Sequence, residues 1–445
     1  MRIAQLPKSL ILGAGSAALL VLSYPAAGLA NSKCVEGLWP SAKSAGVTRA
    51  TFDRAFQGFT PDPEVIEAAN YQPEYVKPVG EYIDRAVSEK RIQIGKEKLV
   101  EYQALLGGLE DRYGVDRTII VAIWGVESNF GVQPGDKNVI RSLATLICSG
   151  TKAKFARPQL VSALKILQRG DINFEGMNGS WAGAMGHTQF IPTTYTAYAV
   201  DQDGDGKRDI WGNIPDALAS TASYLKVSKW QRGQTWGYEV ALPKGFNPKT
   251  VNENTLRSLG EWQKAGIVRV NGEPYPRLSD KASLFAPEGS RGPAFLMLNN
   301  FRSILRYNVA KSYALAVGHL SDRLKGYGPF VHPWPTDETH LSLDQRTEFQ
   351  QLLIARGILD GEPDGVVGPA TLEAVRTYQR SKGLGVDGYP SLTLLKMLRS
   401  EAPPVPTGAI PPAPPAAVEG GQPAAAGEAQ PAAPAAKKPT TVGQE

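Results

Sequence analysis

Glu127 is a carboxylate in an apolar setting, and this combination is typical of a general acid. Ile119, Ile123, Val126 and Glu127 recur at spacings of three and four residues, so on a helix they share one face. Burial and the negative end of the helix dipole are both expected to raise the pKa of such a carboxyl. A carboxyl that keeps its proton near neutral pH can donate it to a leaving group. The alternative is a half-exposed glutamate at a helix end.

The helix that carries Glu127 is expected over residues 116–130. Asp116 is placed to cap its start, and Gly131 is placed to end it. Glu127 is then expected one turn from the C-terminal end of the helix, with apolar neighbours.

Residues 178–192 form a second segment whose residue types could take part in a functional site. It is rich in glycine, small residues, aromatic rings and amides. Its glycines allow close backbone approach. Trp181 and Phe190 offer faces on which sugar rings can stack, and Ser180 and Gln189 offer hydrogen bonds to hydroxyl and acetamido groups. Taken alone, the segment fits a tightly packed glycine-rich loop without a ligand better.

The elements that must position these residues are mostly helices. In residues 31–335 amphipathic stretches alternate with short turns, and strand-like alternation is limited mainly to 236–242 and 266–270. The sequence therefore predicts a mainly α (α+β) fold, in which a helical domain at 31–335 carries a small β insert. The expected helices lie around residues 42–57, 79–110, 116–130, 157–169, 215–226 and 300–325.

A second unit is expected at residues 340–400, after the prolines near 335. It shows a weak internal repeat of a turn followed by a helix, and its length suffices for a small three-helix module. Residues 401–445 hold 11 of the 34 prolines and almost no large apolar side chains. This composition predicts a disordered tail.

The bulk properties indicate an exported chain of more than one domain. It has 445 residues and a formal net charge of +5, with Lys and Arg spread along it, so nucleic-acid binding is not favoured. Residues 1–30 have a basic start, an apolar run and small residues for cleavage after Ala30, as in a signal peptide. No later segment is apolar enough to span a bilayer. Cys34 and Cys148 either pair in an oxidising compartment or remain free thiols.

The segment around Glu127 and the segment at 178–192 together resemble the lytic murein transglycosylase B family. The resemblance begins at Glu-Ser-x-Phe-Gly in 127–131 and continues with Gly-x-Met-Gly-x-x-Gln-Phe-Ile-Pro in 183–192. Further matching stretches at 216–225, 304–308 and 313–317 extend it over nearly all of 31–335. The resemblance implies a lysozyme-like helical fold, a periplasmic location, and cleavage of the glycan strands of peptidoglycan.

The resemblance also assigns roles to individual residues. Glu127 matches the catalytic acid/base, which protonates the oxygen between N-acetylmuramic acid and N-acetylglucosamine. The carboxylate then deprotonates the muramoyl C6 hydroxyl, and a 1,6-anhydro sugar forms without water or a second carboxylate. The alternatives are a hydrolytic muramidase and a non-catalytic wall-binding protein. Residues that match the substrate groove are Ser180, Gln189, Phe190, Tyr224, Tyr307, Asn308 and Tyr313, although each tyrosine, and Tyr224 above all, also fits a core aromatic.

Residues 201–212 have the spacing of a calcium loop, with oxygen ligands at positions one, three and five and glycine at six. Position twelve is Gly212, so the usual bidentate glutamate is missing. We expect a structural Ca²⁺ and no cofactor for catalysis. The alternative is an acidic turn neutralised by Lys207 and Arg208. The expected ligands are Asp201, Asp203, Asp205, Lys207 through its carbonyl and Asp209.

The unit at 340–400 resembles the peptidoglycan-binding domain of three short helices. The matching runs are 357–371, 374–379 and 383–388, which include Asp364-Gly365 and Asp387-Gly388. This resemblance implies that the module tethers the enzyme to its polymer and so raises the local substrate concentration. The alternative is a helical packing domain without a ligand.

Overall fold

The computed structural model of the protein describes residues 33–69, 79–246, 255–288, 292–335, 341–365, 367–384, 388 and 390–401. The expected signal peptide and all but the first residue of the expected tail lie outside these residues. Within the described part, none of the helices has both the length and the apolar character that crossing a membrane requires. The chain is mostly helical, and its apolar side chains gather in three separate clusters.

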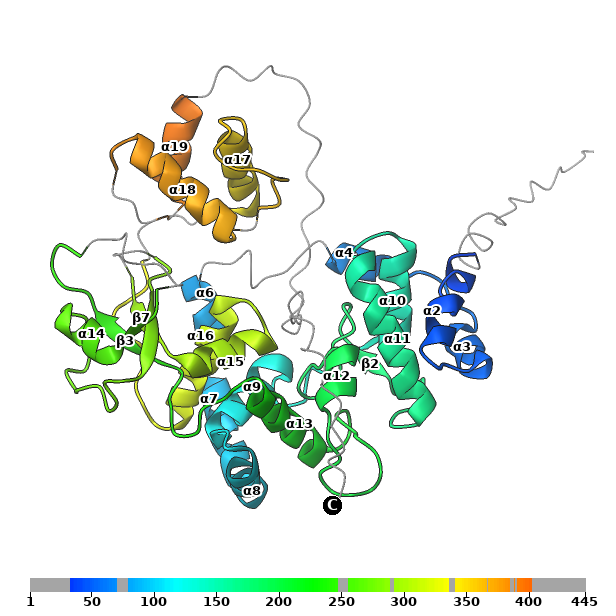
Figure 1. The fold of residues 1–445 in the computed structure, drawn as a ribbon. Coiled ribbons are helices and arrows are strands. Elements are labelled where there is room, and N and C mark those ends of the chain that lie inside the picture. The colour runs from blue at the N-terminus through cyan, green and yellow to red at the C-terminus, as the bar shows by residue number, and fades with distance from the viewer. Residues whose placement is uncertain are drawn as a thin grey trace, which may run out of the picture.

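The N-terminal part consists of short helices packed beside two longer ones (Figure 1). The helical pattern expected around 42–57 is divided between two helices, because Thr48 caps a new helix by accepting the Thr51 N–H. Cys34 and Cys148 form a disulfide that joins the segment before α2 to the last residue of α10. The elements are α2 (Trp39–Ser44), α3 (Arg49–Phe56), α4 (Pro63–Ala68), α10 (Val139–Cys148) and α11 (Ala153–Arg169).

The helical stretch expected at 79–110 is divided into three helices. Ser88 caps the second by accepting the Arg91 N–H, and Tyr102 lies between the second and the third. These helices are α6 (Val79–Ala86), α7 (Glu89–Glu101) and α8 (Gln103–Tyr113). Helices α6 and α7 pack against α16 (Lys311–Leu324), which follows α15 (Asn299–Tyr307). The helix expected at 300–325 is thus also divided, at Asn308.

Helix α9 (Arg117–Ser128) runs through the centre of the large domain. Every residue of α9 after Arg117 is buried, so the helix is covered on all sides and not only on the face that the sequence indicated. It packs against α7, α8, α13 (Ile214–Val227) and α16. Short elements nearby are β1 (Lys137–Asn138), β2 (Asn178–Gly179) and α12 (Pro192–Tyr198).

The β insert is an antiparallel sheet with the strand order β4-β6-β7-β3-β5. Its strands β6 and β7 were missed in the sequence, because nearly all their residues are buried and no polar alternation remains. Trp262 of α14 packs on the sheet and donates to the Ala282 carbonyl at 3.0 Å. The elements are β3 (Gly237–Ala241), β4 (Arg257–Ser258), α14 (Leu259–Lys264), β5 (Val268–Arg269), β6 (Lys281–Phe285) and β7 (Ala294–Met297).

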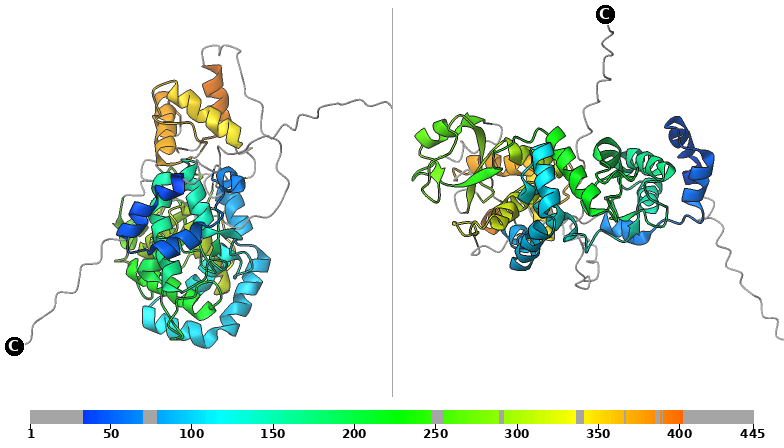
Figure 2. Two further views of the ribbon diagram at one scale, coloured as in Figure 1. Left: turned by 90° about the vertical axis from the view of Figure 1, so that its right-hand side faces the viewer. Right: turned by 90° about the horizontal axis from the view of Figure 1, so that it is seen from below.

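Helices α17 (Leu343–Ile354), α18 (Pro369–Ser381) and α19 (Leu392–Ser400) form the expected three-helix module, which stands apart as a group in the left view of Figure 2. It has a core of its own, which includes Phe349, Leu353 and Tyr378. The internal repeat is visible as one hydrogen bond made twice: Gln350 accepts the Gly365 N–H at 2.6 Å, and Gln379 accepts the Gly388 N–H at 2.9 Å.

Candidate active site

The end of α9 places Glu127 inside the protein. Asp116 caps the helix as expected, accepting the Thr118 N–H at 2.9 Å. Gly131 does not end the helix, because Asn129 is the C-cap, with a left-handed φ of 50°. Gly131 is needed for another reason: a Cβ at this position would lie 2.2 Å from the His187 ring. Glu127 is 3% exposed and lies within the last turn, next to the final residue of the helix.

Tyr313 is the direct partner of the Glu127 carboxyl. Its hydroxyl donates to Oε1 at 2.5 Å, from the first turn of α16 and across 186 residues of sequence. Burial, and then the negative charge of Glu127, raises the pKa of Tyr313 well above its ordinary value. The phenol therefore stays protonated and remains a donor to whichever form of the carboxyl is present.

The loop at 178–192 is folded tightly on itself beside this pair. Strand β2 pairs with β1, and Met185 forms bridges to Gly179 and Phe190. The Ser180 hydroxyl accepts the Ala184 N–H at 3.1 Å. Gln189 has a left-handed φ of 53°, and its amide donates to the Pro134 and Gly186 carbonyls at 2.8 and 2.9 Å. These bonds hold the loop in shape.

Phe190, Tyr224 and Tyr307 form an aromatic cluster under the loop. Their ring centroids lie 5.2 to 5.9 Å apart. The Tyr307 hydroxyl donates to the Thr188 carbonyl at 2.5 Å, and burial followed by the charge of Glu127 raises its pKa well above the ordinary value. The Tyr224 hydroxyl donates to the Arg306 carbonyl. Tyr224 thus has the contacts of a core aromatic with a satisfied hydroxyl.

The site residues predicted from the sequence differ in how directly the structure connects them to Glu127. Tyr313 contacts Glu127, and Tyr307 lies close enough for its pKa to respond to that carboxylate. Phe190 is fully buried, so its ring supports the cluster and is not open for stacking on a sugar. Asn308 uses its side chain to accept the Ala310 N–H at 3.0 Å, at the start of α16. Trp181 is 9% exposed, with the Lys152 ammonium 5.8 Å from its ring centroid.

Two further residues of α9 were missed in the sequence, together with their partner in the loop. Trp124 Nε1 donates to His187 Nδ1 at 3.1 Å, and the Ser128 hydroxyl donates to the His187 carbonyl at 2.5 Å. Burial is the largest cause that lowers the pKa of His187, so the imidazole is neutral. Only the short spacing of Trp124 and Ser128 from Glu127 could have suggested these contacts.

The acidic loop keeps three of its five expected ligands together. Carboxylate oxygens of Asp201, Asp203 and Asp205 lie within 4.8 Å of one another. Asp209 does not join them, and the expectation that it does is wrong: its Oδ1 accepts the N–H groups of Trp211 and Gly212 at 2.8 and 2.9 Å. This turn begins the segment that leads into α13.

The basic residue next to the loop faces away from it. Arg208 pairs with the buried Asp171 at 3.1 Å and stacks over the Tyr195 ring at 5.0 Å. The idea that Arg208 neutralises the acidic turn is therefore wrong. Asp216, which the sequence did not single out, accepts the N–H groups of Gln202 and Asp209 at 2.6 and 2.8 Å and so closes the loop at its base.

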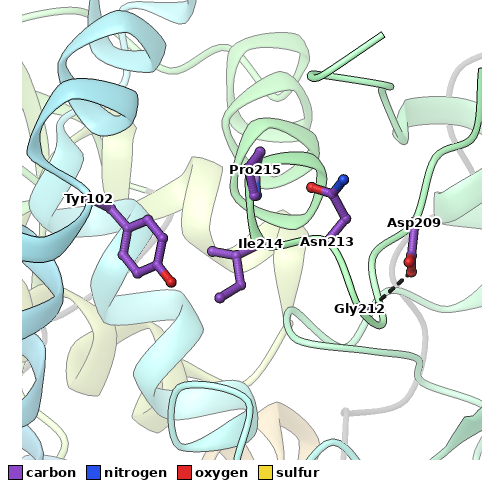
Figure 3. A pocket seen from close by; sticks show the side chains of 6 residues that line it. All are labelled: Tyr102, Asp209, Gly212, Asn213, Ile214 and Pro215. Carbon is purple, nitrogen blue, oxygen red and sulfur yellow. Dashed lines mark hydrogen bonds between the residues drawn. The ribbon is translucent and has the colours of Figure 1, made fainter. Parts of the chain in front are cut away.

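A pocket of about 440 Å³ opens between Tyr102 and the start of α13, and is shown from close by in Figure 3. It is an open depression, and none of the residues that line it is a predicted substrate residue. They are Tyr102, Asp209, Gly212, Asn213, Ile214 and Pro215.

Comparisons with known proteins agree with this geometry. Residues 30–322 match the family described as "Transglycosylase SLT domain", and residues 342–398 match "Putative peptidoglycan binding domain". The chain is 50% identical to SltB3 from Pseudomonas aeruginosa, solved in complex with NAG-anhNAM-pentapeptide, with a TM-score of 0.78 over 83% of this chain and 99% of that one.

Two Escherichia coli proteins are also similar. Membrane-bound lytic murein transglycosylase B of strain K12 is 31% identical over 245 residues, which is 54% of this chain and 65% of that protein. The structure of lytic transglycosylase Slt35 in complex with calcium is 26% identical, with a TM-score of 0.57 over 66% of this chain and 92% of that one. The chain therefore belongs to the transglycosylase SLT domain family, with a lysozyme-like helical fold.

Proposed function

We propose that the protein is a lytic transglycosylase of peptidoglycan. It cleaves the β-1,4 bond between N-acetylmuramic acid and N-acetylglucosamine and leaves a 1,6-anhydro end. The observation that carries this proposal is the buried Glu127 carboxyl held by the Tyr313 hydroxyl at 2.5 Å. The membership of the family and the likeness to SltB3, solved with an anhydro-muramoyl ligand, support the choice of substrate.

Glu127 acts as acid and then as base. Its protonated carboxyl donates to the glycosidic oxygen while the bond from that oxygen to the muramoyl C1 breaks. The resulting carboxylate takes the proton of the muramoyl C6 hydroxyl, whose oxygen bonds to C1 and closes the 1,6-anhydro ring. The proton given in the first step is recovered in the second, so no water is consumed and the enzyme returns to its starting state.

Tyr313 orients this carboxyl and stabilises its negative charge. The phenol bonds Oε1 of the carboxyl at 2.5 Å and so fixes the orientation in which the carboxyl carries and transfers the proton. When Glu127 is ionised between the two steps, the same hydrogen bond stabilises the carboxylate. Tyr313 is therefore a positioning residue that serves both halves of the reaction.

Of the two carboxylates nearest in sequence to the loop at 178–192, one is paired with arginines and the other is exposed. Asp171 is buried between Arg169 and Arg208 at 3.1 Å from each, and Glu175 is exposed. A glycosidase that uses water or a protein nucleophile needs a second carboxylate opposite the acid. The pairing of Asp171 and the exposure of Glu175 therefore favour a reaction in which the substrate hydroxyl is the nucleophile over the reaction of a hydrolytic muramidase.

The identity of the product tests the proposal. Purified peptidoglycan is digested and the muropeptides are analysed by mass spectrometry. The proposal predicts muramoyl ends that are one water lighter than reducing ends. Reducing ends alone would establish a muramidase, and undigested sacculi with bound protein would establish a wall-binding protein without activity.

We infer that the C-terminal module, which matches a family described as peptidoglycan-binding, holds the catalytic domain on its polymer. Its separate core allows it to fold as a unit beside the catalytic domain. We also propose that the protein acts in the periplasm, which the substrate and the expected signal peptide at 1–30 support.

We also propose that Asp201, Asp203 and Asp205 hold a Ca²⁺ ion that stabilises the fold. The three carboxylates converge and Arg208 is turned away, so the charge they accumulate calls for a cation. The related Slt35 structure is a complex with calcium. The ion would fix the segment between α12 and α13 and takes no part in the reaction.

A further inference from the structure

His187 is the point at which three segments of the large domain meet. Its backbone N–H donates to the Ile210 carbonyl at 2.9 Å, and the backbone of Trp211 accepts a hydrogen bond from its ring. On its other side, ring and carbonyl both bond to α9, through Trp124 and Ser128. The loop at 178–192, the segment after the acidic loop and the catalytic helix are thus joined through one residue.

The two α9 residues bonded to His187 lie on either side of Glu127 in the sequence. Trp124 is one turn before Ser128 and is fully buried, and the Ser128 hydroxyl also accepts the Gly131 N–H at 2.8 Å. The last turn of α9 is where a helix loses its own hydrogen bonds and frays most easily. Bonds at both ends of this turn therefore restrict the position of the Glu127 backbone.

The chemistry of the Trp124–His187 bond fixes the state of the imidazole. An indole N–H can only donate, so His187 Nδ1 must carry its lone pair, and the ring proton lies on Nε2, which faces Trp211. Gly131 packs against the imidazole so closely that a Cβ there would lie 2.2 Å from the ring atoms. The ring is thus held on three sides.

We propose that His187 is a positioning residue of the glycan-cleaving reaction, which holds the last turn of α9, and with it Glu127, against the substrate loop. This inference rests on the proposed function. It assigns to His187 a contribution to kcat that is separate from its contribution to stability, because its bonds to Trp124 and Ser128 fix the helix turn that carries Glu127.

The test compares His187→Phe, His187→Asn and the double variant Trp124→Phe/His187→Phe with the wild type. Phe keeps a ring of similar shape but leaves the Trp124 N–H without its acceptor, whereas the Asn Oδ1 offers an acceptor at the same branch of the side chain. In the double variant the stranded donor is removed. Each protein is assayed for 1,6-anhydro product from soluble peptidoglycan strands, giving kcat and KM, and its Tm is measured.

We expect His187→Phe to lower kcat by about 10- to 100-fold with little change in KM, because a misplaced acid costs rate and not ground-state binding. His187→Asn should recover most of kcat. The double variant should not recover kcat, since the side-chain bond between position 124 and the loop is still missing and only the Ser128 bond to the backbone carbonyl of residue 187 remains.

A wild-type kcat in His187→Phe would overturn this inference and leave the proposed function untouched. So would a kcat that returns with Tm in the double variant, because His187 would then be only structural. A wild-type protein that releases no anhydro product would instead overturn the proposed function, and this inference with it.

Discussion

Glu127 and Tyr313 come from segments far apart in the sequence, and the fold converts them into one chemical unit. The carboxyl is buried away from water and accepts a hydrogen bond from the hydroxyl of a phenol that stays protonated. A hydrogen bond to a charged group in a buried site is stronger than one in water. The pair therefore has the means to carry a proton before the reaction and a charge during it.

Tyr313→Phe should reduce kcat by about tenfold or more, because the carboxylate formed in the first step loses a hydrogen bond of about 1.5–3 kcal/mol. The expected change in KM is small. The measurement is the rate of 1,6-anhydro product release at saturating glycan.

The matched control for this change is Tyr275→Phe. It removes the hydroxyl of another buried tyrosine, which donates to the Ile267 carbonyl at 3.0 Å in the β insert. This variant should keep the wild-type rate. Equal losses in the two variants would show that Tyr313 acts only through stability.

The sequence alone predicted Glu127, because an acidic side chain on an apolar helical pattern is visible within a dozen residues. It could not derive the partnership with Tyr313, which depends on long-range folding, and only the resemblance to a family pointed to that residue. His187 was missed, because a single histidine in a glycine-rich loop has no local signature of its contacts.

At the scale of elements, the predicted helices were mostly in the right places but too long. Periodicity continues across a tight connection, so the stretches at 42–57, 79–110 and 300–325 each concealed a break. The breaks are marked by capping side chains such as Thr48 and Ser88, and at 308 by an asparagine with extended backbone. The last break has a function, since it places Tyr307 and Tyr313 on different helices around the same site.

Asp322 joins α16 to the β insert and makes this contact sensitive to pH. Its Oδ2 accepts the Trp236 Nε1–H at 2.9 Å, and burial raises its pKa to about 7. A raised pKa means that the folded protein binds the proton more tightly than the unfolded chain. The stabilisation is thus complete below about pH 4 and is lost as the pH rises through 7.

We therefore expect the Tm of the wild type to fall between pH 5 and pH 8 more than that of Asp322→Asn. Between pH 5 and pH 8 the upper bound of the difference is about 2.6 kcal/mol, and partial exposure of the carboxyl will reduce it. Asn keeps an oxygen for Trp236 but has no proton to lose. Asp84→Asn, at an exposed position of α6, is the control and should follow the wild type. Parallel curves for all three proteins would contradict the assignment.

The acidic loop gives a second prediction at this scale. Ca²⁺ at a hundredfold excess over its Kd should stabilise the protein by about 2.7 kcal/mol, seen as a rise in Tm that a chelator reverses. Asp203→Asn should remove this response, whereas Asp111→Asn, at an exposed carboxylate of α8, should keep it. A wild-type Tm indifferent to both calcium and chelator would exclude the site.

The whole molecule consists of parts with separate hydrophobic cores. The large domain surrounds the catalytic helix, the β insert packs its own apolar side chains, and the module at 341–401 has a third cluster. The sequence predicted the two main units, because each has its own periodicity and prolines lie between them. It underestimated the sheet, whose buried strands have no alternating pattern.

A chain that ends at residue 335 should cleave short soluble glycans at the same rate as the full chain. On intact sacculi at low enzyme concentration it should be slower by about tenfold or more, because the module no longer raises the local concentration. Both rates are measured by release of anhydro product. Equal rates on sacculi would show that the module does not act as a tether.

The most direct test of the account is Glu127→Gln, which keeps the shape of the side chain and the oxygen that Tyr313 contacts but has no proton to donate. We expect release of 1,6-anhydro product from purified peptidoglycan to fall by at least about 100-fold, while glycan binding and Tm are retained. Glu175→Gln, the same change at an exposed glutamate before the substrate loop, should be fully active. Anhydro product formed by Glu127→Gln at the wild-type rate would contradict the assignment of Glu127 as the acid.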